Sequence, residues 1–121
     1  MIGAGAIGCE MMKNYAMMGI GAGENGLVTL TDDDLIETSN LNRQFLFREK
    51  DIQSPKSSTA AAAAKAMNPS LKVNANLDRI EPKTESKYDN AFFKSTDIVI
   101  NALDNVQARM YVDQRCITNL K

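Results

Sequence analysis

Residues 3–10, GAGAIGCE, place three glycines in the spacing GxGxxG directly before a stretch with helical periodicity. This spacing is typical of the turn from a strand into a helix in a nucleotide-binding α/β domain. Gly3 allows the tight turn, Gly5 lets backbone N–H groups approach phosphate oxygens, and Gly8 lets the helix pack on the sheet. The motif fits a dinucleotide and a mononucleotide triphosphate equally well, and a glycine-rich turn without a ligand is the structural alternative.

The length and composition of the chain exclude several classes of protein and of functional site. The chain has 121 residues, of which 44% are hydrophobic, so it can bury one core and forms one domain or a piece of one. Its 14 basic and 15 acidic residues form no long run of one sign, so we expect neither nucleic acid nor a membrane as a partner. The sequence contains no histidine, which excludes imidazole-based zinc sites and Ser/His/Asp triads.

The two cysteines, Cys9 and Cys116, lie far apart and have no metal-binding spacing. Both lie among apolar neighbours, so we expect structural thiols rather than nucleophiles. A chain with few cysteines, no apolar run of about 18 residues and no basic, apolar leader is typical of a soluble protein in the cytoplasm or nucleus.

Helical and strand patterns alternate along the chain. The first helix, residues 6–19, carries Ile7, Met11, Tyr15 and Met18 on one face, which we expect to be buried. Ser57 or Ser58 is available to cap an alanine-rich helix that Pro69 stops. The pattern predicts helices at 6–19, 58–68, 85–94 and from 105 onward, and strands at 27–31, 71–77 and 97–103.

This alternation predicts an α/β fold, a doubly wound Rossmann-like parallel sheet with right-handed crossovers. The glycine loop should follow the first, central strand, yet only Met1 and Ile2 precede Gly3. We therefore expect a truncated domain whose first strand is largely missing. The isolated chain is expected to fold poorly, because a central strand contributes a large part of a domain's stability.

Acidic residues follow two of the predicted strands, at the edge of a parallel sheet where ligands bind. Asp32 stands a little more than 20 residues after the glycine loop, the place of a carboxylate that accepts from ribose hydroxyls. A solvated turn is the alternative for Asp32, Asp33 and Asp34, and the preferred interpretation for Asp33. Asp104 and Asn105 follow residues 97–103, where Asp104 is suited equally to a phosphate-bound magnesium ion and to a helix N-cap.

Polar side chains crowd the stretch SNLNRQFLF at residues 39–47. Arg43 offers a planar guanidinium that can bridge phosphate oxygens, and the neighbouring amides of Asn40, Asn42 and Gln44 can orient it. A packed turn with a surface arginine is the alternative. Lys56 lies just before the predicted alanine-rich helix, where an anionic ligand would explain a cation near the helix N-terminus. Taken alone, Lys56 is better interpreted as a solvated lysine.

Together, GAGAIGCE, TDDDLIETSNLNRQFLF, the segment from Lys56 that ends AMNPS, and NALDNVQARMYVDQRC resemble the active adenylation domain of eukaryotic ubiquitin-activating enzymes. The resemblance covers essentially the whole chain and falls within the wider ThiF/MoeB-like fold. It implies an enzyme that binds ATP and Mg²⁺, adenylates the C-terminal carboxylate of ubiquitin or a ubiquitin-like protein, and passes the acyl group to a cysteine as a thioester.

The resemblance also implies roles for individual residues. The glycine loop with Ala6 would contact the nucleotide, Asp32 the ribose, and Arg43 and Lys56 the phosphates, while Asp104 would serve magnesium. Arg43, Lys56 and Asp104 would act electrostatically in adenylation. The full set of implied nucleotide-binding residues is Gly3, Gly5, Ala6, Gly8, Asp32, Asn40, Arg43, Gln44, Lys56, Asp104 and Asn105.

Several parts of such enzymes have no counterpart in residues 1–121. These are the catalytic-cysteine domain, the C-terminal domain that recruits the ubiquitin-conjugating enzyme, and the inactive adenylation half. We therefore expect a partial ATP-binding adenylation domain that is inactive alone. Two alternatives stay open: an NAD-dependent Rossmann oxidoreductase domain, which gives Arg43, Lys56 and Asp104 no common task, and a noncatalytic, degenerate fragment.

Overall fold

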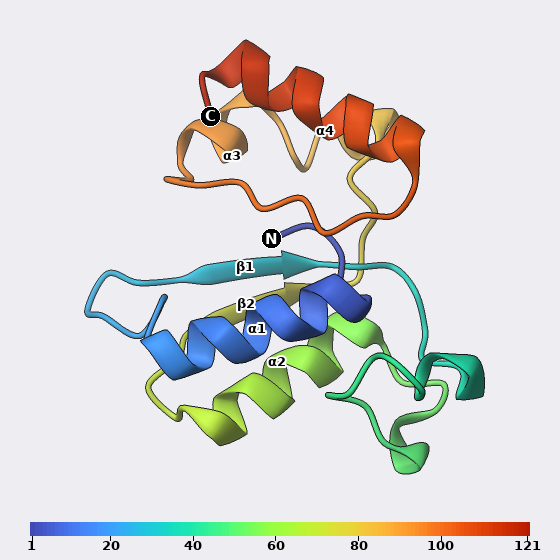
Figure 1. The fold of residues 1–121 in the computed structure, drawn as a ribbon. Coiled ribbons are helices and arrows are strands. Elements are labelled where there is room, and N and C mark those ends of the chain that lie inside the picture. The colour runs from blue at the N-terminus through green and yellow to red at the C-terminus, as the bar shows by residue number, and fades with distance from the viewer.

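A computed structural model describes residues 1–121. Helices and strands alternate in the first half of the chain, and two helices follow in the second half (Figure 1). The elements are α1 (Ala6–Met18), β1 (Val28–Thr31), α2 (Lys56–Met67), β2 (Val73–Asn76), α3 (Asn90–Lys94) and α4 (Val106–Asn119), with short 3₁₀ turns at Thr38–Asn40, Glu49–Asp51 and Pro82–Thr84. None of these helices is long and apolar enough to cross a membrane.

The sheet is parallel. β1 and β2 pair in a register that runs from Val28 opposite Val73 to Thr31 opposite Asn76. Ile2 extends the sheet by one residue, since it forms parallel bridges to Thr31 on one side and to Asn101 on the other. The lateral order is therefore β2, β1, Ile2 and the segment around Asn101. This order confirms the predicted α/β fold with a parallel sheet, and Ile2 lies at the central position expected for the first strand.

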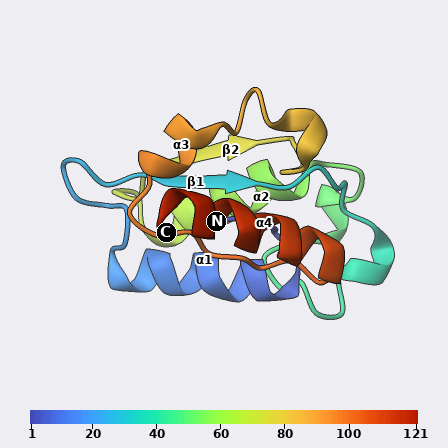
Figure 2. The same cartoon turned by 90° about the horizontal axis from the view of Figure 1, so that it is seen from above.

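Helices cover both faces of this sheet. Figure 1 shows α1 and α2 below the strands and α3 and α4 above them, and in the view of Figure 2 α4 runs in nearly the same direction as β1. α1 packs against α2, and α3 packs against α4. Because the helices that follow Ile2 and Asn101 lie on opposite faces, the chain changes direction of winding between these two residues.

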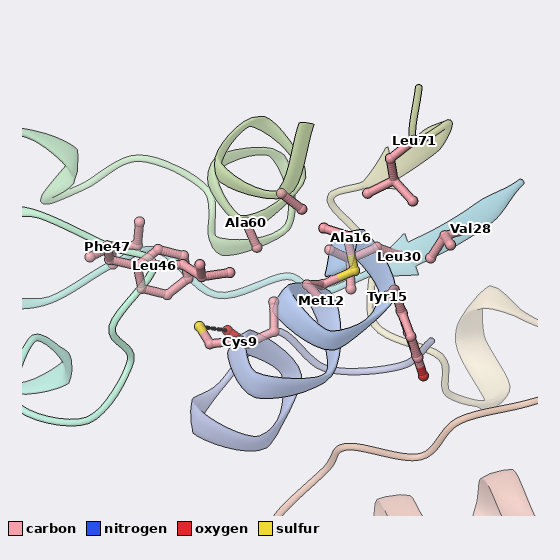
Figure 3. Packing of buried hydrophobic residues seen from close by; sticks show 13 residues of the cluster. Cys9, Met12, Tyr15, Ala16, Val28, Leu30, Leu46, Phe47, Ala60 and Leu71 are labelled. Atoms are coloured by element: carbon pink, nitrogen blue, oxygen red, sulfur yellow. Dashed lines mark hydrogen bonds between the residues drawn. The ribbon is translucent and has the colours of Figure 1, made fainter. Parts of the chain in front are cut away.

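Two hydrophobic clusters hold these layers together. The larger has thirteen buried residues, contributed mainly by α1, β1, α2 and the segment that contains Leu46 and Phe47 (Figure 3). The smaller contains Ile2, Ile80, Tyr88, Phe93 and Val112 and joins α3 and α4 to the sheet.

The predicted buried face of the first helix is correct for Tyr15, which is buried, and wrong for Ile7 and Met18. Ile7 and Met18 are 54% and 65% exposed, whereas Cys9, Met12 and Ala16 are buried (Figure 3). The glycine loop fixes the rotation of the helix, because Gly8 must lie against the backbone of the loop. The face one residue further along is thereby turned toward α2 and the sheet.

The predicted strand at 97–103 is also wrong. Ile98 is 73% exposed, and only Asn101 forms a bridge. The two ladder hydrogen bonds of this segment both involve Ile2, whose N–H donates to the Ile100 carbonyl and whose carbonyl accepts from Ala102. A strand needs a partner along its length, and this segment has one residue opposite it.

Helix boundaries differ at two further places. α3 begins at Asn90 rather than at 85, because a 3₁₀ turn occupies Pro82–Thr84 and the side chain of Asp89 caps the helix by accepting from the Phe92 N–H. α2 begins at Lys56, and its N-cap is Pro55 rather than a serine. Lys56 is therefore the first residue of the helix.

Candidate functional site

At two positions of the loop only glycine fits, because a Cβ there would collide with the backbone of the chain. Gly3 has a φ of +99°, and a Cβ there would lie 2.7 Å from the carbonyl oxygen of Ala102. A Cβ at Gly8 would lie closer than 3.0 Å to the Gly3 carbonyl oxygen. Gly5, the N-cap of α1, has no protein atom nearer to such a Cβ than the Gln44 Nε2 at 3.9 Å. The open side of the loop is therefore at Gly5.

Asp32 ties this loop to the end of β1. Its Oδ2 accepts from the Ala4 N–H at 2.6 Å, and its Oδ1 accepts from the Asp34 N–H at 2.9 Å. Burial raises the pKa of Asp32, and the two backbone hydrogen bonds act in the opposite direction because they favour the carboxylate. Each carboxylate oxygen retains lone-pair capacity for a further donor. The predicted contact with ribose is compatible with this geometry and stays a prediction.

A cavity of about 1230 Å³ opens at the C-terminal ends of the strands. Its wall includes the glycine loop, the residues that follow β1 and β2, and the start of α4. Ten of the eleven predicted nucleotide-binding residues line it: Gly3, Gly5, Ala6, Asp32, Asn40, Arg43, Gln44, Lys56, Asp104 and Asn105. Gly8 is the exception, and its close approach to Gly3 accounts for the glycine there.

The segment at 39–47 presents one cation, Arg43, from a turn that is closed by backbone hydrogen bonds to the Asn40 carbonyl. Asn40 is buried and its Oδ1 accepts from the Glu37 N–H at 3.0 Å. Gln44 is 4% exposed, and its Oε1 has no hydrogen-bond partner. Arg43 is exposed, and its Nη1 donates to the Ser39 carbonyl and to the Asn42 Oδ1. These bonds use one nitrogen of the guanidinium, so its other N–H groups are available to an anion in the cavity.

Lys56 is not a solvated lysine. It is 7% exposed, and its Nζ lies 2.8 Å from the Oδ2 of Asp34. The backbone N–H of Lys56 also donates to the Asp34 carbonyl oxygen at 3.0 Å. Asp34 is thus paired, which corrects the solvated-turn interpretation for this residue. The turn therefore delivers a fixed ammonium to the cavity wall.

The start of α4 separates two roles that the sequence left open. Asn105 is the N-cap, because its Oδ1 accepts from the Ala108 N–H at 3.0 Å. Asp104 is exposed, lines the cavity and makes no side-chain hydrogen bond or ion pair. An unpaired carboxylate on the wall of this cavity fits the oxygen preference of Mg²⁺. The interpretation of Asp104 as the N-cap is therefore wrong.

Residues that follow β2 also line the cavity, and no motif in the sequence had singled them out. Asp78 and Arg79 lie there, and Arg79 forms an ion pair of 3.2 Å with the exposed Asp33. The sequence could have indicated them, because they follow a predicted strand and ligands in open parallel sheets lie beyond the carboxyl ends of the strands.

Neither cysteine has the character of a nucleophile. Cys9 is fully buried, and burial raises its pKa to about 11. Its Sγ donates to the Ala4 carbonyl at 3.8 Å. Cys116 is half-buried, and burial raises its pKa as well. Both thiols are protonated near neutral pH, whereas the thiolate is the attacking species.

The whole chain, residues 1–121, matches the model of the ThiF family. The chain belongs to the ThiF family. It is 59% identical to the mouse ubiquitin-like modifier-activating enzyme 6 and 62% identical to the ubiquitin-like modifier-activating enzyme 1 of Dictyostelium discoideum. These matches cover 100% and 97% of this chain but 12% of each relative. The ThiF chain thus spans about an eighth of their length.

Solved structures agree with the ThiF fold. The tRNA N6-threonylcarbamoyladenosine dehydratase TcdA of E. coli superimposes with a TM-score of 0.84 and is 25% identical over 98% of this chain and 46% of its own. A further structure of that enzyme, in complex with ATP, matches to the same extent.

Proposed function

We propose that this chain forms the ATP site of an enzyme that activates ubiquitin or a ubiquitin-like protein by adenylating its C-terminal carboxylate. The proposal is supported by the 59% and 62% identity to enzymes named as ubiquitin-like modifier-activating, over nearly the whole chain. It is also supported by a fold neighbour whose structure holds ATP.

The observation that carries the proposal is the convergence of four separate segments on one cavity. The glycine loop, Arg43, Lys56 and Asp104 lie far apart in sequence, and all line the same cavity. Two cations and an open N-terminal helix turn suit a triphosphate, and an unpaired carboxylate suits a divalent cation bound to it. An NAD-dependent reaction would leave this combination of charges without a task.

In the proposed reaction, a carboxylate oxygen of the modifier attacks the α-phosphorus of ATP, and pyrophosphate leaves. Arg43 and Lys56 would offset the negative charge that develops on the phosphates, and the N–H groups at the start of α1 would orient them. Asp32 would accept from ribose hydroxyls. The enzyme does little covalent work in this step, so positioning and charge account for most of the rate.

Asp104 is the residue we propose for magnesium, and Asn105 lies beside it on the cavity wall. When bound, Mg²⁺ supplies positive charge that neutralises the phosphate oxygens. The carboxylate of Asp104 would hold the ion or its waters, and the capping bond of Asn105 fixes the backbone that carries Asp104.

The later steps are assigned to parts of the enzyme outside residues 1–121. We propose that the adenylate passes to a cysteine there as a thioester, because Cys9 and Cys116 are protonated and at least half-buried. The inactive adenylation half and a domain that receives the ubiquitin-conjugating enzyme are the further proposed partners. The proposed compartment is the cytoplasm and nucleus.

The test is modifier-dependent exchange of pyrophosphate into ATP by the full-length protein. Replacing Arg43→Ala and Asp104→Ala together should lower kcat/KM for exchange by roughly 100-fold or more, because each removes a charge at the phosphates. The matched control is Arg48→Ala, which removes an exposed arginine outside the cavity wall. Exchange that survives the double replacement would contradict the site assignment, and a protein without any exchange would support the degenerate alternative.

A further inference from the structure

Asp34 has no role in the proposed reaction, yet it holds one of the two cations at the cavity. Its Oδ2 lies 2.8 Å from the Lys56 Nζ, and its backbone carbonyl accepts from the Lys56 N–H. The side chain of Lys56 is 9% exposed and that of Asp34 is 55% exposed. The lysine is therefore enclosed, and the aspartate that fixes it stands at the rim.

Without Asp34 the position of Lys56 would be unfavourable. Lys56 is the first residue of α2, where the helix dipole disfavours a cation, and an enclosed ammonium loses most of its hydration. A carboxylate at hydrogen-bond distance offsets both costs. The pair therefore keeps the ammonium in one place beside the cavity.

Lys56 retains capacity to bind a ligand in this arrangement. An ammonium group has three N–H donors, and within the chain the Nζ donates only to Asp34. Lys56 and Asp34 both line the cavity. One donor thus anchors the side chain, and the others are free for phosphate oxygens.

We propose that Asp34 is the positioning residue for Lys56 and so sets the affinity of the site for the phosphates of ATP. This inference rests on the proposed function, because it requires that Lys56 bind phosphate. Asp34 touches no substrate in this account and acts through Lys56 alone. The opposite arrangement, in which Asp34 competes with phosphate for the ammonium, predicts the reverse effect on affinity.

The experiment measures the affinity of the full-length protein for ATP and for adenosine. Asp34→Asn should weaken ATP binding roughly tenfold, as expected for the loss of a charged hydrogen bond, and leave adenosine binding unchanged. Glu10→Gln is the matched control, because Glu10 is an exposed carboxylate that pairs with Lys13, and neither residue lines the cavity. A purely structural role for Asp34 would weaken both ligands equally and would contradict the proposal.

A second pair of variants guards against loss of folding. Asp34→Glu keeps the charge but lengthens the side chain, so the protein should melt normally and still bind ATP less tightly. In a Lys56→Met background, Asp34→Asn should cause no further loss of ATP affinity, because the two residues act as a unit. Unchanged or tighter ATP binding in both Asp34 variants would overturn the inference.

The Lys56→Met variant distinguishes failure of the inference about Asp34 from failure of the proposed ATP site. If it weakens ATP binding while the Asp34 variants do not, Asp34 is not a positioning residue and the proposed ATP site stands. If Lys56→Met leaves ATP affinity unchanged, the placement of Lys56 at the phosphates is wrong, and the inference about Asp34 fails with it.

Discussion

The glycines of the loop serve two different purposes. Gly3 and Gly8 are needed where backbone meets backbone, since a Cβ at either would collide with a carbonyl oxygen. Gly5 alone faces the cavity without a close protein neighbour. The loop therefore keeps its shape without a ligand, and its open glycine is the one placed for phosphate.

Replacing Gly8→Ala should destabilise the first turn of α1 by about 2 kcal/mol or more, because the new Cβ has no space beside the Gly3 carbonyl. Hydrogen exchange of the α1 amides, followed by mass spectrometry, should accelerate by roughly 30-fold in the full-length protein. Gly23→Ala is the control, because no atom lies within 4 Å of its Cβ position. Equal exchange rates in the two variants would show that the close contact carries no energy.

The sequence predicted residues that line the cavity, but it did not predict which of their side chains contact one another. Arg43, Lys56 and Asp104 were singled out, and all three line the cavity. The contact between Lys56 and Asp34 joins residues 22 positions apart, and no local pattern reports such a contact. The choice of Asn105 over Asp104 as the N-cap depends on a one-residue difference in helix start, which residue preferences do not resolve.

At the scale of the element, sequence patterns identified helices better than strands. The alanine-rich segment forms α2 as its helix propensity predicts, because a helix satisfies its backbone within itself. A strand depends on its neighbour, so residues 97–103 failed to form the strand that their apolar composition predicts. The rotation of α1 was missed for the same reason, since the glycine loop and not the helix sets it.

The start of α4 offers a test of the capping assignment. Asn105→Ala should destabilise this helix by about 1 kcal/mol, because the Ala108 N–H loses its acceptor. Asp104→Ala should leave the stability of α4 unchanged, although it should slow the exchange of pyrophosphate into ATP. Hydrogen exchange in the first turn of α4 distinguishes the two, and faster exchange in Asp104→Ala than in Asn105→Ala would reverse the assignment.

For the whole molecule, alternation of helices and strands was sufficient to predict the class of fold and the edge at which the cavity lies. The lateral order of β2, β1, Ile2 and Asn101 brings loops from both halves of the chain to that edge. Helices on both faces of the sheet contribute the residues that bury the two hydrophobic clusters. Asp78 and Arg79 line the cavity because this strand order places the end of β2 beside it. The order depends on pairing between distant segments, so no single segment predicts it.

We propose that this cavity binds ATP with magnesium rather than a nicotinamide dinucleotide. Thermal unfolding of the full-length protein tests it most directly, because a ligand that binds the folded state raises the melting temperature. MgATP should raise the Tm, NAD should not, and the Arg43→Ala, Asp104→Ala double variant should lose most of the rise. A Tm raised by NAD and unmoved by MgATP, or a rise that the double variant retains in full, would contradict the account.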